Sequence, residues 1–92
     1  MAIERRRVSY GGRVQGVGFR MTAVRLASGR PVSGTVRNLE DGRVELVIEG
    51  EKQDLVAYLD AIHREFGNMI RDIAIEPETP GIEPLAGFTI LY

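Results

Sequence analysis

The sequence predicts an α+β fold in which an antiparallel sheet of four to five strands carries two helices on one face. Segments with alternating apolar residues, typical of half-buried strands, surround two segments whose apolar residues recur every three or four positions, as in amphipathic helices. The chain has 92 residues, of which 43% are hydrophobic, and this is enough for one small core but not for two. We therefore expect residues 1–92 to form a single domain.

The first half of the chain predicts a strand, a helix and a second strand. Residues 3–10 alternate in polarity, as a half-buried strand does. A helix begins near Phe19, and Gly29 is placed to cap its carboxyl end. Residues 32–37 alternate again and predict the second strand. The apolar stripe of the helix consists of Phe19, Ala23, Leu26 and Ala27.

The second half predicts a strand, a helix and two further strands. Residues 43–49 alternate after a short turn, which predicts a hairpin with the second strand. A second helix covers residues 51–66 and is closed by a glycine. A short strand around residues 73–75 follows, then a proline-bearing loop over residues 77–84 and a final strand over residues 88–92. The apolar stripe of this helix consists of Leu55, Leu59, Ile62 and Phe66.

This order of elements, strand-helix-strand-strand-helix-strand with one added strand, is typical of the ferredoxin-like split βαβ sandwich. In that topology the first helix returns the chain, so that the first and second strands run in the same direction. The loop after the first strand and Asn38, at the end of the second, must then lie at the same edge of the sheet. Eighteen residues separate Arg20 from Asn38 in the sequence.

The loop between the first strand and the first helix has the features of an anion-binding turn. Gly16 and Gly18 let the backbone curl so that several N–H groups point inward, and a helix start adds unpaired donors. Arg20 is a cation in the first helical turn, where it is unfavourable unless an anion compensates it. A glycine-rich turn with an exposed arginine is the alternative. The spacing matches neither a Walker loop nor the dinucleotide-binding motif.

Two segments resemble the signatures of the acylphosphatase family. The first is Gly12-Arg13-Val14-Gln15-Gly16-Val17-Gly18-Phe19-Arg20, and the second is Gly34-Thr35-Val36-Arg37-Asn38 followed by Gly42-Arg43-Val44 and Gly50. The resemblance covers essentially the whole chain, including its final strand. The chain departs from the family at Thr35, usually an aromatic residue, at Tyr10, usually aliphatic, and in the longer link over residues 29–34.

The resemblance implies metal-independent hydrolysis of the carboxyl–phosphate bond of an acyl phosphate to a carboxylate and inorganic phosphate, with no cofactor. Backbone N–H groups and the guanidinium would hold the phosphate, from Gln15, Gly16, Val17, Gly18, Phe19 and Arg20. Asn38 would orient the attacking water, because its neutral amide offers a donor and an acceptor without repelling the phosphate. Taken alone, Asn38 is more typical of a turn residue than of a catalytic one. Arg20 and Asn38 are thus the expected catalytic residues.

Charge and composition limit the kinds of ligand, nucleophile and metal site that the chain can have. Residues 1–43 carry nine arginines against three acidic residues, which suits anion recognition, whereas the rest of the chain is acidic. The absence of cysteine excludes disulfides, a thiolate nucleophile and a cysteine-based zinc site. His63 is interpreted as a partly exposed helix residue, and Glu40 and Asp41 as turn residues, so we expect no metal site.

We expect a monomer in the cytoplasm that binds a small-molecule acyl phosphate and neither nucleic acid nor a membrane. No apolar segment is long enough to span a membrane, and no signal-peptide core follows the basic start. An RNA-binding module of the same fold is disfavoured, because residues 43–49 contain no aromatic side chain. A domain serving carbamoyl phosphate chemistry stays open, because the loop alone does not distinguish that substrate from other acyl phosphates.

Overall fold

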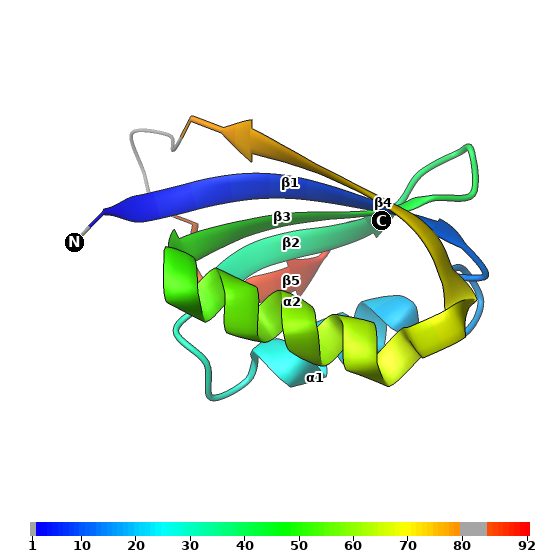
Figure 1. Cartoon of the computed structure of the whole chain (residues 1–92), viewed down its shortest axis with the longest axis horizontal. Helices are drawn as coiled ribbons and strands as arrows, with labels where there is room; N and C mark the ends of the chain where they lie inside the picture. Colours follow the sequence, from blue (N-terminus) through cyan, green and yellow to red (C-terminus); the bar gives the residue numbers. More distant parts are fainter. Residues whose placement is uncertain (1, 80–84) are drawn as a thin grey trace.

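The computed structural model describes residues 2–79 and 85–92 and confirms the predicted order of elements (Figure 1). The elements are β1 (Ile3–Gly12), α1 (Phe19–Ala27), β2 (Ser33–Asn38), β3 (Val44–Glu51), α2 (Lys52–Phe66), a short 3-10 helix (Gly67–Met69), β4 (Ile70–Glu78) and β5 (Phe88–Ile90). Within the described ranges, no helix is both long and apolar enough to cross a membrane.

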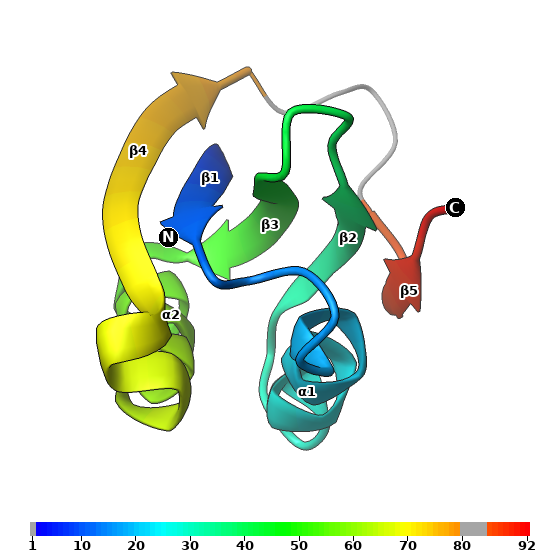
Figure 2. The same ribbon diagram turned by 90° about the vertical axis from the view of Figure 1, so that its right-hand side faces the viewer.

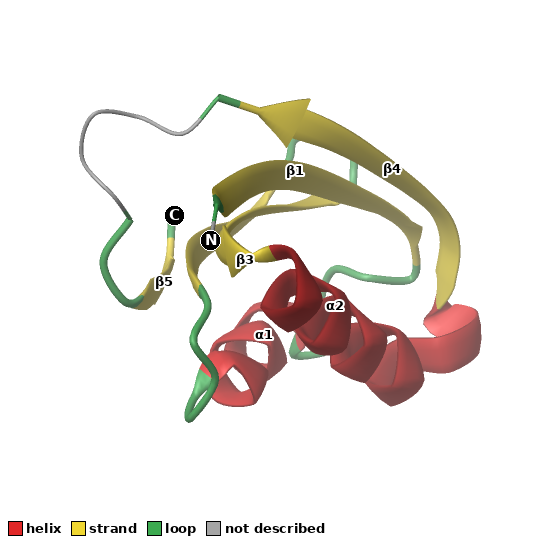
Figure 3. Ribbon diagram, turned by 60° about the vertical axis from the view of Figure 1, so that its left-hand side comes forward, coloured by secondary structure: helices red, strands yellow, loops and turns green. Residues whose placement is uncertain are grey.

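The five strands form one sheet in the order β4-β1-β3-β2-β5, and both helices lie on the same face of it (Figures 2 and 3). Strands β1 to β4 pair antiparallel, as predicted, and this arrangement is the ferredoxin-like sandwich. The prediction of a purely antiparallel sheet is wrong at one edge, where β5 pairs parallel with β2. Because β4 runs opposite to β2 and the chain reverses after β4, β5 must run in the direction of β2.

The core lies between the sheet and the two helices, as the apolar stripes predict. Every second residue of the central strands faces the helices, and each large side chain buried there contributes about 1.5–3 kcal/mol through removal of apolar surface from water. The fully or almost fully buried residues are Val8, Tyr10, Val14, Phe19, Ala23, Ala27, Val32, Val36, Val44, Leu46, Ile48, Leu55, Tyr58, Leu59, Ile62 and Phe66.

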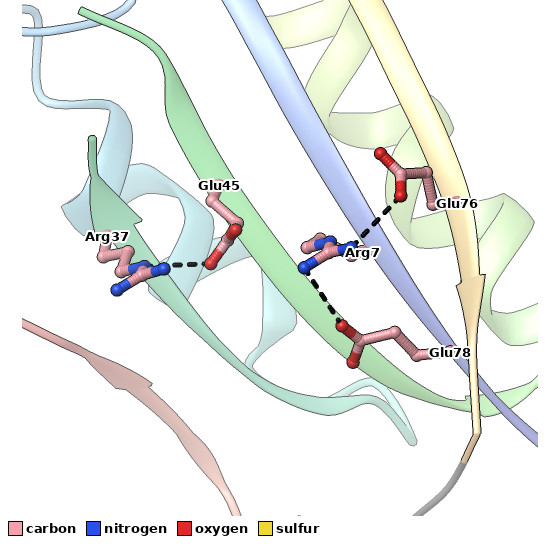
Figure 4. A network of polar contacts seen from close by, with 5 residues as sticks. All are labelled: Arg7, Arg37, Glu45, Glu76 and Glu78. Atoms are coloured by element: carbon pink, nitrogen blue, oxygen red, sulfur yellow. Dashed lines mark hydrogen bonds and ion pairs between the residues drawn. The ribbon is translucent and has the colours of Figure 1, made fainter. Parts of the chain in front are cut away.

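The opposite face of the sheet carries paired charges (Figure 4). Arg7 on β1 contacts Glu76 at 3.1 Å and Glu78 at 3.6 Å, both on β4. Arg37 on β2 contacts Glu45 on β3 at 2.9 Å. Exposed pairs of this kind contribute at most about 1 kcal/mol each. Because carboxylates already compensate Arg7 and Arg37, these two arginines are less suited to bind an anionic ligand.

Strand β4 is longer than the short strand predicted around residues 73–75. It spans Ile70–Glu78, so it includes the start of the predicted proline-bearing loop; residues 80–84 of that loop lie outside the described residues. Ile73 and Ile75 are 43% and 51% exposed. An edge strand whose side chains are mostly exposed has no need for strict alternation, and this is why its sequence pattern is weak.

Candidate active site

A pocket of about 190 Å³ opens beside the loop that joins β1 to α1. The loop crosses from the end of β1 to the start of α1 and passes below the arrowhead of β2 in Figure 2. The pocket is formed by this loop, the first turn of α1, the end of β2, and the segment that contains β5. Its lining residues are Val14, Gly16, Gly18, Phe19, Arg20, Met21, Asn38, Ile90 and Tyr92.

The loop has the backbone conformation that its glycines allow. Gly16 and Gly18 have φ angles of 76° and 78°, in the left-handed region that is unfavourable for residues with a side chain. A Cβ atom added at either position would meet no atom within 4 Å, so the backbone angle and not crowding requires glycine. Gly18 is the N-cap residue of α1, and no side chain caps this helix start.

The backbone N–H groups of this loop are free to bind a ligand. The Arg13 N–H donates to the carbonyl of Met69, and the Thr22 N–H donates to that of Gly18. From Val14 to Met21, between these two bonds, no backbone N–H group donates to another residue that the structure describes. The first turn of α1 contains no acidic residue. Free donors and the positive end of the helix dipole therefore meet at the pocket, which favours an anion.

Arg20 adds a full positive charge to this pocket. No carboxylate among the described residues forms an ion pair with it, in contrast to Arg37 and Arg43, which pair with Glu45 and Asp72. Its guanidinium carbon lies 5.2 Å from the ring centroid of Tyr92, a cation–π contact that does not neutralise the charge. The guanidinium therefore keeps its donors available for an anionic ligand.

Asn38, the last residue of β2, lines the same pocket as Arg20. It follows Val36 on the helix-facing side of the strand, because alternate residues of a strand share a face. Its side-chain amide makes no hydrogen bond to the described parts of the chain, so it is available to a ligand or a water molecule. The prediction that the loop and Asn38 lie at one edge of the sheet is confirmed.

The predicted phosphate-binding residues do not all contribute in the same way. Gly16, Gly18, Phe19 and Arg20 line the pocket, whereas Gln15 and Val17 do not. The Phe19 ring is buried and stacks on Phe66, with ring centroids 4.3 Å apart, so only its backbone is suited to bind an anion. The Gln15 side chain turns away from the pocket and bonds to the turn after β2.

Met21, Ile90 and Tyr92 form an apolar side of the pocket that was not predicted from the sequence. The alternation of Phe88, Ile90 and Tyr92 indicates a strand, but not which strand it pairs with. The parallel pairing of β5 with β2, in which Ile90 lies beside Val36, brings this segment to the pocket.

The residues that depart from the family pattern lie away from the pocket lining. Tyr10 is fully buried, and its hydroxyl lies 3.0 Å from Nε2 of His63. Thr35 pairs with Val47 and Thr89 on the sheet face opposite the helices. The longer link around Pro31 lines a separate pocket at the far end of α1. None of the three belongs to the residues that line the pocket.

The other titratable residues agree with their sequence interpretation. Burial lowers the pKa of His63, and the nearby Asp60 carboxylate opposes this shift only in part. Asp41 accepts a hydrogen bond from the Arg43 N–H at 3.0 Å, as a turn residue does. Within residues 2–79 and 85–92, no three His, Asp or Glu side chains are grouped closely enough to hold a metal ion.

Comparison with known proteins gives a consistent result. The sequence model of the acylphosphatase family matches residues 6–90. The acylphosphatase of Haloarcula marismortui is 42% identical over 94 residues, and the match covers all of both chains. That of Nostoc sp. is 45% identical over 82 residues, 86% of this chain and 77% of the relative. The crystal structure of acylphosphatase from Bacillus subtilis superposes with a TM-score of 0.85 at 33% identity, over 99% and 100% of the two chains.

Proposed function

Because this chain belongs to the acylphosphatase family, we propose that it hydrolyses the carboxyl–phosphate bond of an acyl phosphate, releasing a carboxylate and inorganic phosphate. The observation that carries this proposal is the pocket in which unpaired backbone N–H groups, the unpaired guanidinium of Arg20 and the free amide of Asn38 meet. Acylphosphatases are hydrolases, and a phosphate-binding cradle next to a water-binding amide is suited to hydrolysis at phosphorus.

The loop and Arg20 hold the phosphoryl group. The free N–H groups between Val14 and Met21 donate to its oxygens, and the guanidinium donates two parallel hydrogen bonds. As the bond to the leaving oxygen lengthens, charge on the phosphoryl oxygens is stabilised by donors that are already in place. Arg20 therefore serves both in binding and in catalysis.

Asn38 orients the attacking water. Its amide oxygen accepts a hydrogen bond from the water and fixes its position in line with the phosphorus atom, on the side opposite the leaving carboxylate. A neutral amide does this without repelling the phosphate. The leaving group is a carboxylate, which is stable as an anion, so no general acid is required, and a phosphoryl oxygen of the substrate accepts the proton of the water.

The proposed mechanism requires no metal ion, because Arg20 and the loop donors supply the positive potential that a metal would otherwise provide. We accordingly expect chelation by EDTA to leave turnover unchanged. The assay is release of inorganic phosphate from benzoyl phosphate, with and without EDTA, in enzyme freed of metal by dialysis. A large loss of activity that Mg²⁺ restores would contradict metal independence while leaving the acylphosphatase assignment in place.

The acyl group is the part of the substrate that the apolar side of the pocket contacts. Met21, Ile90 and Tyr92 give a substrate with an aromatic or aliphatic acyl group more favourable contacts than one with a small polar group. We therefore infer a lower KM for benzoyl phosphate than for carbamoyl phosphate. Measuring phosphate release from both compounds over a range of concentrations tests this; equal KM values would contradict it. We further propose that residues 1–92 act as one domain and as a monomer in the cytoplasm.

A further inference from the structure

The side-chain amide of Gln15 joins the two parts of the chain that form the pocket. Its Nε2 atom donates one hydrogen bond to the carbonyl oxygen of Leu39, at 2.8 Å, and another to that of Arg43, at 2.9 Å. Both carbonyls belong to the turn between β2 and β3. Gln15 directly precedes Gly16, and Leu39 directly follows Asn38. The hydrogen bonds of the Gln15 amide therefore join sequence neighbours of two pocket residues, Gly16 and Asn38.

The turn that accepts these two hydrogen bonds is itself firmly held. The Leu39 N–H donates to the Arg43 carbonyl at 2.8 Å, and the Gly42 N–H donates to the Leu39 carbonyl at 3.2 Å. The Arg43 guanidinium pairs with Asp72 at 2.8 Å and donates to the carbonyl of Ser9 at 3.3 Å. These contacts fasten the turn to β1 and β4, so it is a fixed support against which the loop can be positioned.

The loop has few other attachments. The buried side chains of Val14 and Phe19 anchor its two ends in the core. Apolar contacts are not directional, so they hold the loop close without fixing its position relative to β2. Within the described chain, Gln15 is the one residue of the segment 14–21 whose side chain makes a hydrogen bond. The orientation of the loop relative to β2 therefore depends on this amide.

We propose that Gln15 is a positioning residue, whose side-chain amide sets the distance between the phosphate held by the loop and the water oriented by Asn38. This inference rests on the function proposed above. An amide suits the position because its NH₂ group supplies two donors for two carbonyls. A misplacement of about 1 Å at a reacting centre is enough to reduce a rate about a hundredfold, so a contact outside the pocket can control turnover.

The variant Gln15→Met tests this role, since it keeps the length of the side chain and removes both donors. Turnover and inhibition by inorganic phosphate are measured in the wild-type background and in the Asn38→Ala background. We expect kcat to fall about tenfold or more in the wild-type background, with phosphate inhibition changed less than about threefold. In the Asn38→Ala background the further loss is less than about threefold, because there is no amide left to position.

Two controls separate this role from a general loss of stability. Gln53→Met changes an exposed glutamine in the first turn of α2 and leaves both backgrounds unchanged. Thermal unfolding of each variant gives the folded fraction to which turnover is normalised. Gln15→Ala carries the same test if the methionine variant does not fold.

Each other outcome has a distinct reading. Equal losses in the two backgrounds, or unchanged turnover per folded molecule of the Gln15 variant, would overturn the positioning role and leave the proposed function in place. If Asn38→Ala itself turned over at the wild-type rate, the proposed role of Asn38 would fail, and Gln15 would have no amide to position.

Discussion

Arg20 lines the pocket, and no carboxylate of the described residues compensates its charge. Arg37 and Arg43 are paired with acidic residues, whereas the guanidinium of Arg20 forms no ion pair with the described residues and lies 5.2 Å from the centroid of the Tyr92 ring. An uncompensated cation at a helix start is electrostatically unfavourable. Its presence is explained if a bound anion completes the site.

The substitution Arg20→Lys is expected to reduce kcat/KM about tenfold to a hundredfold, because an ammonium group does not reproduce the two parallel hydrogen bonds of a guanidinium. Inhibition by inorganic phosphate should weaken in parallel, while the unfolding temperature stays near the wild-type value. Steady-state kinetics and thermal unfolding measure these effects.

Arg25→Lys is the matched control for this experiment, because Arg25 lies in the same helix with a side chain that is 64% exposed. It should have wild-type activity. A folded Arg20→Lys protein with the kinetics of the control would show that the guanidinium does not hold the phosphate.

Some site residues can be predicted from the sequence and others cannot. Arg20 is visible because a cation is unfavourable in the first turn of a helix, and the glycines are visible because they allow positive φ angles in a turn. The side-chain role of Gln15 is not, because its hydrogen-bond partners are carbonyls, which every residue has. The hydrogen bond between Tyr10 and His63 is not predictable either, because 53 residues separate the two in the sequence.

At the scale of elements, the loop before α1 depends on backbone angles that few residues adopt. Gly18→Ala should reduce stability by about 1–2 kcal/mol, because alanine in the left-handed region is strained. Activity per folded molecule should fall as well, because the strained loop reorients the N–H groups next to the pocket. Denaturant unfolding and steady-state kinetics measure the two effects separately.

Gly29, just after the end of α1, provides the control for this prediction. It has the same φ angle of 78°, and an added Cβ would likewise meet no atom within 4 Å. Gly29→Ala should therefore lose similar stability and keep its activity. If both variants kept full activity per folded molecule, the loop conformation would have no part in catalysis.

The elements themselves are predicted well where one side of them is buried. Helices α1 and α2 and strands β1 to β3 face the core, and their boundaries differ from the prediction by at most two residues. Strand β4 and the pairing of β5 are predicted poorly. Their residues are largely exposed, and the partner of an edge strand depends on the path of the whole chain.

At the scale of the whole molecule, Tyr10 and His63 connect the sheet to α2. The Tyr10 ring also packs against Phe19, a lining residue of the pocket, with ring centroids 5.3 Å apart. Burial raises the pKa of Tyr10, so its hydroxyl stays protonated and available for the hydrogen bond. The hydrogen bond is therefore present while His63 is neutral.

The stability of the fold should decrease as the pH falls through about 6.5, the ordinary pKa of histidine. Burial lowers the pKa of His63 in the folded state, so the unfolded chain binds this proton more tightly, and protonation favours unfolding. The stability that neutral His63 contributes is fully present above about pH 6.5. It is lost progressively as the pH falls from about 6.5 to the lower pKa of the folded state. Denaturant unfolding between pH 8 and 5 measures this dependence.

The variant His63→Gln should flatten this pH dependence, because glutamine does not titrate. Asp60 and Arg6 lie beside His63 in the same surface pocket. An unchanged pH profile in the variant would assign the dependence to other groups.

Single-turnover hydrolysis of benzoyl phosphate by the Asn38→Ala variant, measured beside its inhibition by inorganic phosphate, tests most directly whether one pocket holds the phosphate and orients the water. We predict that kcat and kcat/KM fall together about a hundredfold or more, roughly 3 kcal/mol, because the amide acts chiefly in the transition state. KM and phosphate inhibition should barely change. A lower unfolding temperature with unchanged turnover per folded molecule would contradict this mechanism and leave Asn38 as a turn residue.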